Sequence, residues 1–322
     1  ELVFKNKDGK YYFADLKNFD KIKFEFEFVE YDESQNTSRS GILIMGLGHQ
    51  SAAQLNDLFD LVNVIDNTIT LSITIAIPSS ITEITNKDLI KTLTDNKVMI
   101  ISSLAHELKH AYDAYKKPSE KIKNRAPYTT YSSTRTGISE VDEFIFFLYF
   151  ITTIENLVRP SEIYSQMQEG NITREDFLEF ISSNTTYQTL KKINNFSVNN
   201  MISSLKEKPE DLDTFISRNS NYEAPEDIDE KIELFLFVLY IELSKNILSR
   251  ALNILRNNFF EALFGISEEK QKFMDAYESE ILRFKNNPLK YFEFQEKKFK
   301  FVSEKMMRRL SKLYSLAKPN PI

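Results

Sequence analysis

The stretch that decides the fold is VMIISSLAHELKHAY, residues 98–112. Its apolar residues recur at helical spacing and Pro118 follows soon after, so we predict a half-buried helix from Val98 to Tyr115. His106 and His110, two of only three histidines in the chain, stand four residues apart. Because four residues make about one helical turn, both imidazole rings project from the same face of this helix.

This arrangement of two histidines around a glutamate is typical of a metal site. Two imidazoles one turn apart can bind one tetrahedral Zn²⁺, with nitrogen–metal distances of about 2.0–2.1 Å. Glu107 lies to one side of the pair, where its carboxylate can take a proton from a metal-bound water and pass it to a leaving amine. The sequence therefore predicts Zn²⁺ as the cofactor, His106 and His110 as metal ligands and Glu107 as the catalytic general base.

A zinc site needs a third protein ligand, and it must come from outside this stretch. The extended metzincin pattern would have glycine and histidine where this chain has Asp113 and Lys116, so that pattern is excluded. The only other histidine, His49, lies upstream, which favours a carboxylate from a later helix. Five acidic residues are candidates: Glu140, Asp142, Glu143, Glu155 and Glu162.

Among these candidates Glu155 is preferred. We predict a helix from Ser139 to about Val158, ended by Pro160, on which Glu155 shares an apolar face with Phe144, Leu148 and Ile151. A buried carboxylate needs a partner. That partner is either zinc or Arg159 one turn further on, and the two can coexist. Glu162 is the reserve, and the acidic residues at 140–143 are expected to cap the start of their helix.

Outside the motif helix, the first 80 residues carry strand patterns. Residues 21–28 alternate charged and apolar side chains, and residues 42–47 follow after a polar stretch, so a hairpin with a long loop is expected. The clearest strand, 69–77, alternates Ile or Leu with Thr, Ser or Ala. From about Lys87 onward the pattern is helical.

The expected fold class is therefore α+β. A small, mostly antiparallel N-terminal sheet packs on the HExxH helix, and a large all-helical region follows. We expect two domains, a metallopeptidase-like core at 1–185 and a helical C-terminal region at 186–322.

Composition excludes several other functions. The chain has no Cys, which removes disulfide scaffolds, thiolate metal sites and cysteine catalysis. It has 41 Lys and Arg against 47 Asp and Glu, a net charge of -6, so nucleic acid is not expected as a partner. The longest uncharged apolar runs, 144–154 and 234–241, are shorter than the roughly 20 residues that span a bilayer, so no transmembrane segment is expected.

The motif at 106–110 followed by Ala111, with a later segment TTIENLVR at 152–159, resembles the gluzincin branch of the zincin metallopeptidases. The resemblance covers about residues 20–165. It implies a small sheet whose edge strand precedes the active helix and holds an extended peptide, Glu107 as base, and His106, His110 and Glu155 as zinc ligands. The chain departs from the thermolysin-like pattern in having Arg159 where that pattern has Asp, and in having no histidine after His110.

Two functions follow from this reading. The first is a zinc-dependent endopeptidase acting on a protein or peptide substrate, with Tyr128 or Tyr131 as a candidate donor to the oxyanion. The second is a non-catalytic structural or assembly protein that retains a zincin-like core and uses its C-terminal helices to dock a protein partner. Basic and apolar residues interleave at 297–313, which is typical of an amphipathic helix, either solvated or docked on a protein or membrane surface.

Overall fold

The computed structural model describes residues 21–31, 43–51, 68–80, 85–116, 127, 130–256, 275 and 282–319. The chain divides into two compact units. Unit 1 comprises residues 1–118, 158–173 and 317–322, and unit 2 comprises residues 119–157 and 174–316. Both units are discontinuous in sequence, whereas the predicted domains, 1–185 and 186–322, divide the chain only once and stay a prediction. The fold is rich in helix and of the α+β class.

The sheet of unit 1 has three described strands, β1 (Lys21–Tyr31), β2 (Leu43–Ser51) and β3 (Thr68–Pro78), in the order β1-β3-β2. β1 pairs with β3 in parallel, and β2 pairs with β3 antiparallel. The pairing is therefore mixed rather than mostly antiparallel, and the expected hairpin between the first two strands is wrong because β3 lies between them.

The side chains of β3 explain its central place. A central strand is bonded on both sides, and its Ile, Leu and Thr residues pack well on a pleated surface. Ile75 and Ala76 of this strand are buried. β1 instead alternates its apolar residues with Lys21, Lys23, Glu25 and Glu27, which suits an edge strand.

The central place of β3 also overturns one implication of the zincin resemblance. The strand before the motif helix was expected at the edge of the sheet, ready to hold an extended peptide. β3 is instead paired along its length with β1 on one side and with β2 on the other. Its backbone groups are used in these ladders, so a substrate cannot add to β3 by β-augmentation.

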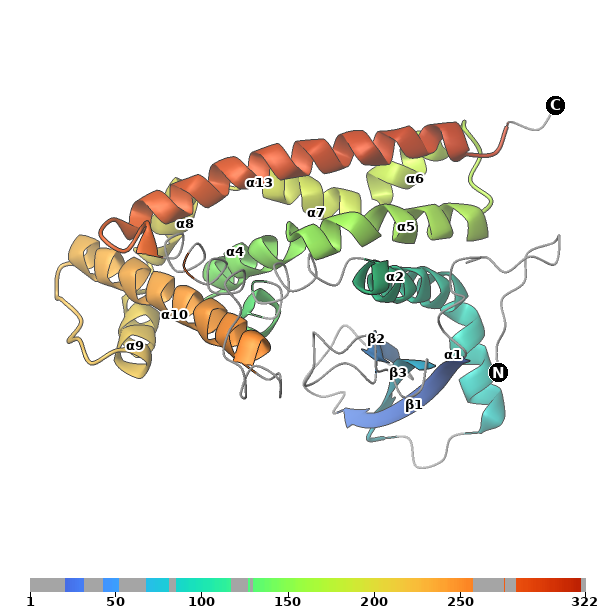
Figure 1. Cartoon of the computed structure of the whole chain (residues 1–322), viewed down its shortest axis with the longest axis horizontal. Coiled ribbons are helices and arrows are strands. Elements are labelled where there is room, and N and C mark those ends of the chain that lie inside the picture. Colours follow the sequence, from blue (N-terminus) through green and yellow to red (C-terminus); the bar gives the residue numbers. More distant parts are fainter. Residues whose placement is uncertain are drawn as a thin grey trace. The chain divides into compact units, whose positions relative to one another are not determined.

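Two helices follow the sheet in unit 1. α1 (Asn86–Asp95) begins with a capping box, in which the Thr85 side chain accepts from the Asp88 amide and the Asp88 side chain accepts from the Thr85 amide. α2 (Lys97–Lys116) carries the motif stretch and confirms the helix predicted for 98–115. It packs against β2 and β3, as Figure 1 shows. The predicted packing of the sheet on the motif helix is therefore present.

The next helical segment differs from the prediction of one helix ended by Pro160. α4 (Ser139–Phe150) stops at Ile151, and α5 (Thr153–Glu169) begins two residues after that stop. The Asn156 side chain donates to the Ile151 carbonyl at 2.7 Å, which satisfies a carbonyl group left open at the end of α4. Pro160 lies inside α5, so it does not end the helix.

The other described elements of unit 2 are helices. They are α6 (Phe177–Ser183), α7 (Thr185–Asn194), α8 (Val198–Leu205), α9 (Pro209–Asn219), α10 (Ile228–Arg256), α13 (Pro288–Ser311) and the 3-10 helix η4 (Lys312–Leu316). α13 contacts α7, α10, α8 and α4 and runs alongside α7 in Figure 1. No helix in the described ranges combines the length and apolar character that a bilayer crossing requires.

Aromatic rings form the centre of unit 2. Phe144, Phe292 and Phe299 are fully buried, and the Phe299 ring centroid lies 5.5 Å from that of Phe144. Phe299 also makes edge contacts with Phe147 at 5.9 Å and Phe196 at 5.4 Å. These contacts tie α13 to α4 and to the segment between α7 and α8.

Two phenylalanines on α13 allow a matched test of this core. Phe299→Ala should lower the free energy of unfolding by about 3–5 kcal/mol, because it removes a buried ring from a close-packed site. Phe301, two residues later, is 68% exposed, so Phe301→Ala should change stability by only about 0.5 kcal/mol. Urea unfolding followed by circular dichroism measures both, and equal losses would contradict the described packing.

Candidate metal centre

The HExxH motif lies in the second half of α2, and its backbone is helical throughout. His106 is buried, with 8% of its surface exposed, and Ser102 one turn earlier is also buried. The side chains of Glu107 and His110 lie outside the described residues, as do the side chain of His49 and residue Tyr128. The predicted meeting of the two histidine rings therefore stays a prediction, while the environment of His106 is described in detail.

Polar side chains join α2 to the second half of α5 within unit 1. His106 Nδ1 lies 3.2 Å from Glu162 Oε2, and Gln166 Nε2 donates to Ser102 Oγ at 3.4 Å. An ion pair at 3.0 Å then links Lys97 to Glu169. Residue numbers rise along α5 as they fall along α2, so the two helices run antiparallel and meet about once per turn.

Among these contacts between α2 and α5, the carboxylate that meets the motif itself is that of Glu162, the reserve candidate for the third zinc ligand. Its Oε2 also accepts from Arg159 Nη1 at 2.9 Å, one turn earlier on α5. The side chains of His106, Glu162 and Arg159 are 10%, 15% and 17% exposed. A carboxylate thus stands between an imidazole and a guanidinium, largely shielded from water.

The charge of Glu162 is maintained by these two partners. Burial raises the pKa of Glu162, but the hydrogen bond with His106 and the positive charge of Arg159 outweigh it and lower the pKa below its usual value. The carboxylate is therefore ionised at neutral pH and acts as an acceptor. Nδ1 of His106 donates to it, and in a neutral imidazole this leaves Nε2 as the nitrogen with a lone pair for a metal.

Glu155, the preferred third ligand, is fully buried as predicted. The reason differs from the prediction, because Glu155 lies on α5 and Phe144 and Leu148 lie on α4, beyond the helix break. Its Oε1 accepts a hydrogen bond from the Tyr149 hydroxyl at 2.9 Å. Glu155 belongs to unit 2 and His106 to unit 1, so the role of Glu155 as a metal ligand stays a prediction.

The acidic residues at the start of α4 have local roles. Asp142 accepts from the Thr136 and Gly137 amides at 2.6 and 3.2 Å, which fastens the segment before the helix. Glu140 pairs with Lys208, and Glu143 is exposed. The hydrogen bond and charge of Lys208 hold the pKa of Glu140 below its usual value. Asp142 therefore bonds backbone amides just before the helix, whereas Glu140 pairs with a distant lysine and Ile138 at the N-cap position makes no side-chain cap hydrogen bond, so the expected capping role is found for Asp142 and not for Glu140.

Among the described side chains, no group of three or more His, Cys, Asp or Glu is arranged to hold a metal ion. The side chains of Glu107 and His110, which complete the motif, lie outside the described residues. The described part of the centre is thus His106, whose ring is oriented by the Glu162 carboxylate. This pair fits a zinc ligand, because metal-bound histidines commonly donate their second ring nitrogen to a carboxylate.

Sequence reasoning did not predict the contact of Glu162 with His106 or the contacts of Tyr149 and Gln166. The cause was the treatment of Pro160 as a helix end, which left Glu162 outside any helix. If the helix is continued through Pro160, Arg159, Glu162, Gln166 and Glu169 recur every three or four residues. That spacing was the available signal for a polar face opposite the motif helix.

Comparison with known proteins adds no relative. No family model, curated protein or solved structure matches the chain. The resemblance to the zincins therefore depends on the motif residues, and the function has to be argued from the site.

The contact of Glu162 with His106 and Arg159 can be tested through stability. Glu162→Gln should lower the free energy of unfolding by about 1–3 kcal/mol, because a largely buried guanidinium and imidazole lose their charged acceptor. Glu169 is the control on the same helix: its ion pair with Lys97 is more exposed, and Glu169→Gln should cost less than about 1 kcal/mol. Urea unfolding of the metal-free protein measures both, and equal effects would contradict the described geometry.

Proposed function

We propose that the protein is a zinc-dependent endopeptidase. The observation that carries the proposal is the contact of His106 Nδ1 with the Glu162 carboxylate, found on the helix that bears the HExxH motif. In this proposal His106 and His110 are two zinc ligands, Glu155 is the third, and Glu107 is the general base. The motif supplies the ligand types and spacing, and the contact supplies the orientation of one ligand.

Glu162 and Arg159 support His106 in this role. A carboxylate at Nδ1 sets the imidazole tautomer and makes the opposite nitrogen more basic. Arg159 keeps that carboxylate ionised, and the depressed pKa of Glu162 is the sign of this charge. The low exposure of the three side chains limits competition from water for these contacts.

Bound zinc would polarise the scissile carbonyl and lower the pKa of its water to about 7. Glu107 would then hold the proton removed from that water and deliver it to the leaving amine. Its place next to His106 in the sequence sets it on a neighbouring side of the helix rather than on the ligand face. The general base and the two histidine ligands are therefore expected on different sides of α2.

An extended peptide remains the proposed substrate. β3 cannot bind it as an added strand, so strand pairing with substrate is proposed at β1 or β2, each of which, among the described strands, pairs with β3 along one side. Tyr128 and Tyr131 both stay candidate donors to the oxyanion, and Tyr128 lies outside the described residues. The described residues favour neither strand edge over the other.

The role of Glu107 gives the decisive experiment. Elemental analysis should find about one zinc per chain, and a generic unfolded protein should be hydrolysed until a chelator removes the metal. Glu107→Gln should reduce hydrolysis by at least about 10²–10⁴-fold, the usual contribution of a general base, while zinc content stays unchanged. Hydrolysis is followed by gel electrophoresis and peptide release.

Lys109→Gln, at a variable position of the same motif, is the control and should keep both zinc and activity. Loss of zinc from Glu107→Gln would mean that Glu107 is a ligand. A wild-type protein that binds no zinc and cleaves nothing would favour the structural or assembly role.

The third ligand is tested by comparing the two buried glutamates of α5. Glu155→Ala should remove zinc from the protein, because two histidines alone bind it too weakly. Glu162→Ala and Arg159→Ala should weaken zinc binding only about 10–100-fold, as expected for groups that orient a ligand. Competitive titration with a zinc chelator measures all three affinities.

Tyr149→Phe is the matched control for Glu155, since it removes the hydrogen bond at 2.9 Å and keeps the carboxylate. It should retain zinc. If Glu155→Ala keeps the metal and Glu162→Ala loses it, the third ligand is Glu162 and the enzyme class is unchanged.

A further inference from the structure

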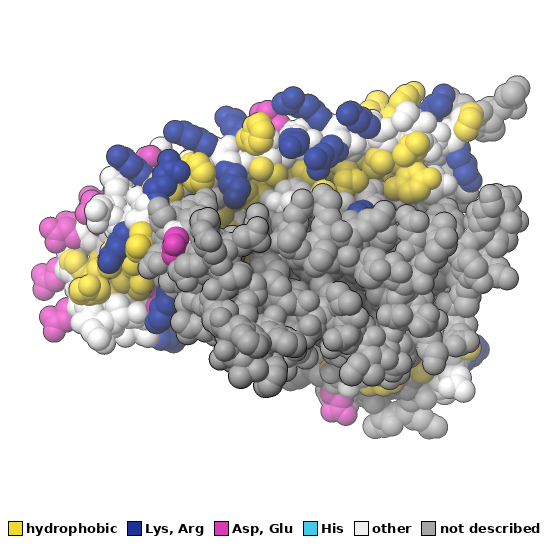
Figure 2. All heavy atoms as spheres, in the orientation of Figure 1, with side chains coloured by type: hydrophobic (Ala, Val, Ile, Leu, Met, Phe, Trp, Pro, Cys, Tyr) yellow, Lys and Arg dark blue, Asp and Glu magenta, His cyan; other side chains and the backbone are white. Residues whose placement is uncertain are grey.

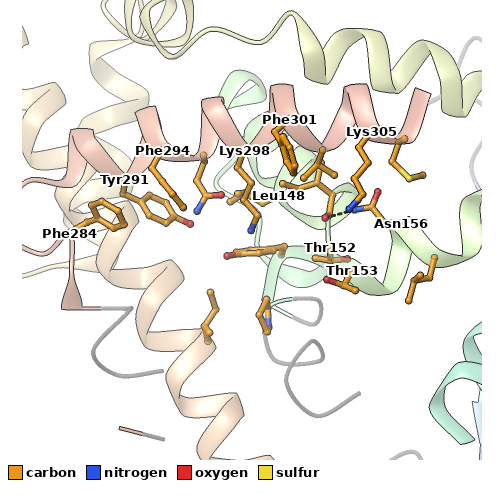
Figure 3. A pocket seen from close by; sticks show the side chains of 18 of the residues that line it. Leu148, Thr152, Thr153, Asn156, Phe284, Tyr291, Phe294, Lys298, Phe301 and Lys305 are labelled. Carbon is orange, nitrogen blue, oxygen red and sulfur yellow. Dashed lines mark hydrogen bonds between the residues drawn. The ribbon is translucent and has the colours of Figure 1, made fainter. Parts of the chain in front are cut away.

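Unit 2 contains a cavity of about 400 Å³, and neither the described motif histidine nor the two buried glutamates of α5 line it, although the oxyanion candidate Tyr131 does. Its walls come from α13, from α10 and from the turn between α4 and α5. In Figure 3, Lys298 and Lys305 point from α13 toward the side of the cavity on which Thr152, Thr153 and Asn156 lie. The volume lies within the range of about 300–1,000 Å³ that is usual for small-molecule sites.

Most of the wall is apolar or aromatic. Leu148 lies in the last turn of α4 and Ile151 directly after that helix, and Phe284, Tyr291 and Phe294 lie at the start of α13 and just before it. Such a surface favours an aliphatic chain or a ring over a sugar or a nucleotide.

Two of the residues that line the cavity carry a buried polar group. Gln295 is 6% exposed and Tyr240 is 2% exposed, and both line the cavity. Within the described residues neither Gln295 Oε1 nor the Tyr240 hydroxyl has a hydrogen-bond partner. Buried polar groups of native proteins are almost always paired, so a pair of unpaired ones at a cavity points to a ligand that carries an N–H or O–H donor.

Basic residues of α13 line one side of the cavity. Lys305 and Arg309 line it with Lys298, all from the same side of α13, and no acidic residue occurs among the described lining residues. Figure 2 shows Lys and Arg side chains gathered along α13 on the face drawn, with hydrophobic side chains between them. In a chain with a net charge of -6, this local excess of cations favours an anionic ligand.

We propose that this cavity binds a small amphipathic anion, with an apolar chain in the aromatic part, an amide or hydroxyl donor at Gln295 and Tyr240, and a carboxylate near Lys305 and Arg309. An N-acyl amino acid has all three parts in this order, and N-decanoylglycine is the probe of this class. The proposal does not depend on zinc or on peptidase activity, so either can fail without the other.

The absence of tryptophan from the chain allows a clean reporter. Phe294→Trp places a single indole at the cavity, on a side chain that is 40% exposed and so tolerant of the larger ring. N-decanoylglycine, kept below the concentration at which it forms micelles, should change the tryptophan emission with saturation at one molecule per chain. Tyr222→Trp, outside the cavity and 57% exposed, should show no change.

Matched probes separate the contributions of charge and donor. The methyl ester of N-decanoylglycine keeps the chain and the amide but has no charge, and it should bind at least about tenfold more weakly. Decyltrimethylammonium has a chain of equal length with the opposite charge and should not bind at the site.

Charge-reversal variants test the cationic wall on the reporter background. Lys305→Glu with Arg309→Glu should weaken binding of N-decanoylglycine by at least about tenfold and leave the ester unaffected. Lys297→Glu with Lys300→Glu reverses two exposed charges of the same helix that do not line the cavity. This control should leave the affinity within about twofold.

Gln295→Met tests the contact in which the ligand amide donates to Gln295 Oε1, because methionine has no such acceptor and is similar in size to glutamine. It should weaken binding of N-decanoylglycine while decanoate, which has no amide, binds as before. A structural role of Gln295 alone would change both affinities equally or neither.

Three results would overturn the proposal. One is a reporter signal that does not saturate, and another is equal binding of the anionic, neutral and cationic probes. The third is binding of the protein to vesicles of phosphatidylcholine and phosphatidylglycerol. In this case N-decanoylglycine would not compete with the vesicles, and both charge-reversal pairs would abolish vesicle binding equally. That result would make α13 a membrane-surface helix instead.

Discussion

Polar contacts at successive turns join α2 to the second half of α5, and the candidate centre depends on this antiparallel pairing. At its most buried point His106 meets Glu162, and Arg159 holds Glu162 in its charged form. The next contacts, at Ser102 and Lys97, keep the two helices in the same register. A rotation of α5 by one residue would move Glu162 by about 100° and leave the imidazole without its acceptor.

The break between α4 and α5 is the second constraint on the chain. The turn at Ile151 and Thr152 ends one helix and starts another, and the Asn156 side chain closes it by bonding the Ile151 carbonyl. The same turn lines the cavity of unit 2, and Glu155, buried against Tyr149, follows it directly. One local interruption therefore shapes both the cavity and the environment of the preferred third ligand.

Pattern reasoning worked best where local chemistry and tertiary structure agree. The motif helix was predicted to within a residue at each end, since its apolar spacing, its length and Pro118 all indicate the same element. The burial of Glu155 was also predicted, although for a reason that the helix break removes. Pattern reasoning failed for Pro160, because packing of buried residues on both sides of it, among them Val158, Ile163 and Met167, stabilises α5 through the proline.

The sequence by itself determined the α+β class, the helix at 97–116 and the residue types that a zinc site requires, because these depend on spacing along one segment. Only the tertiary structure decided that β3 is the central strand and that Glu162 is the partner of His106. Strand order and helix register depend on contacts between segments far apart in the chain. Their free energies come from burial and from paired charges, and a periodic pattern within one segment does not record them.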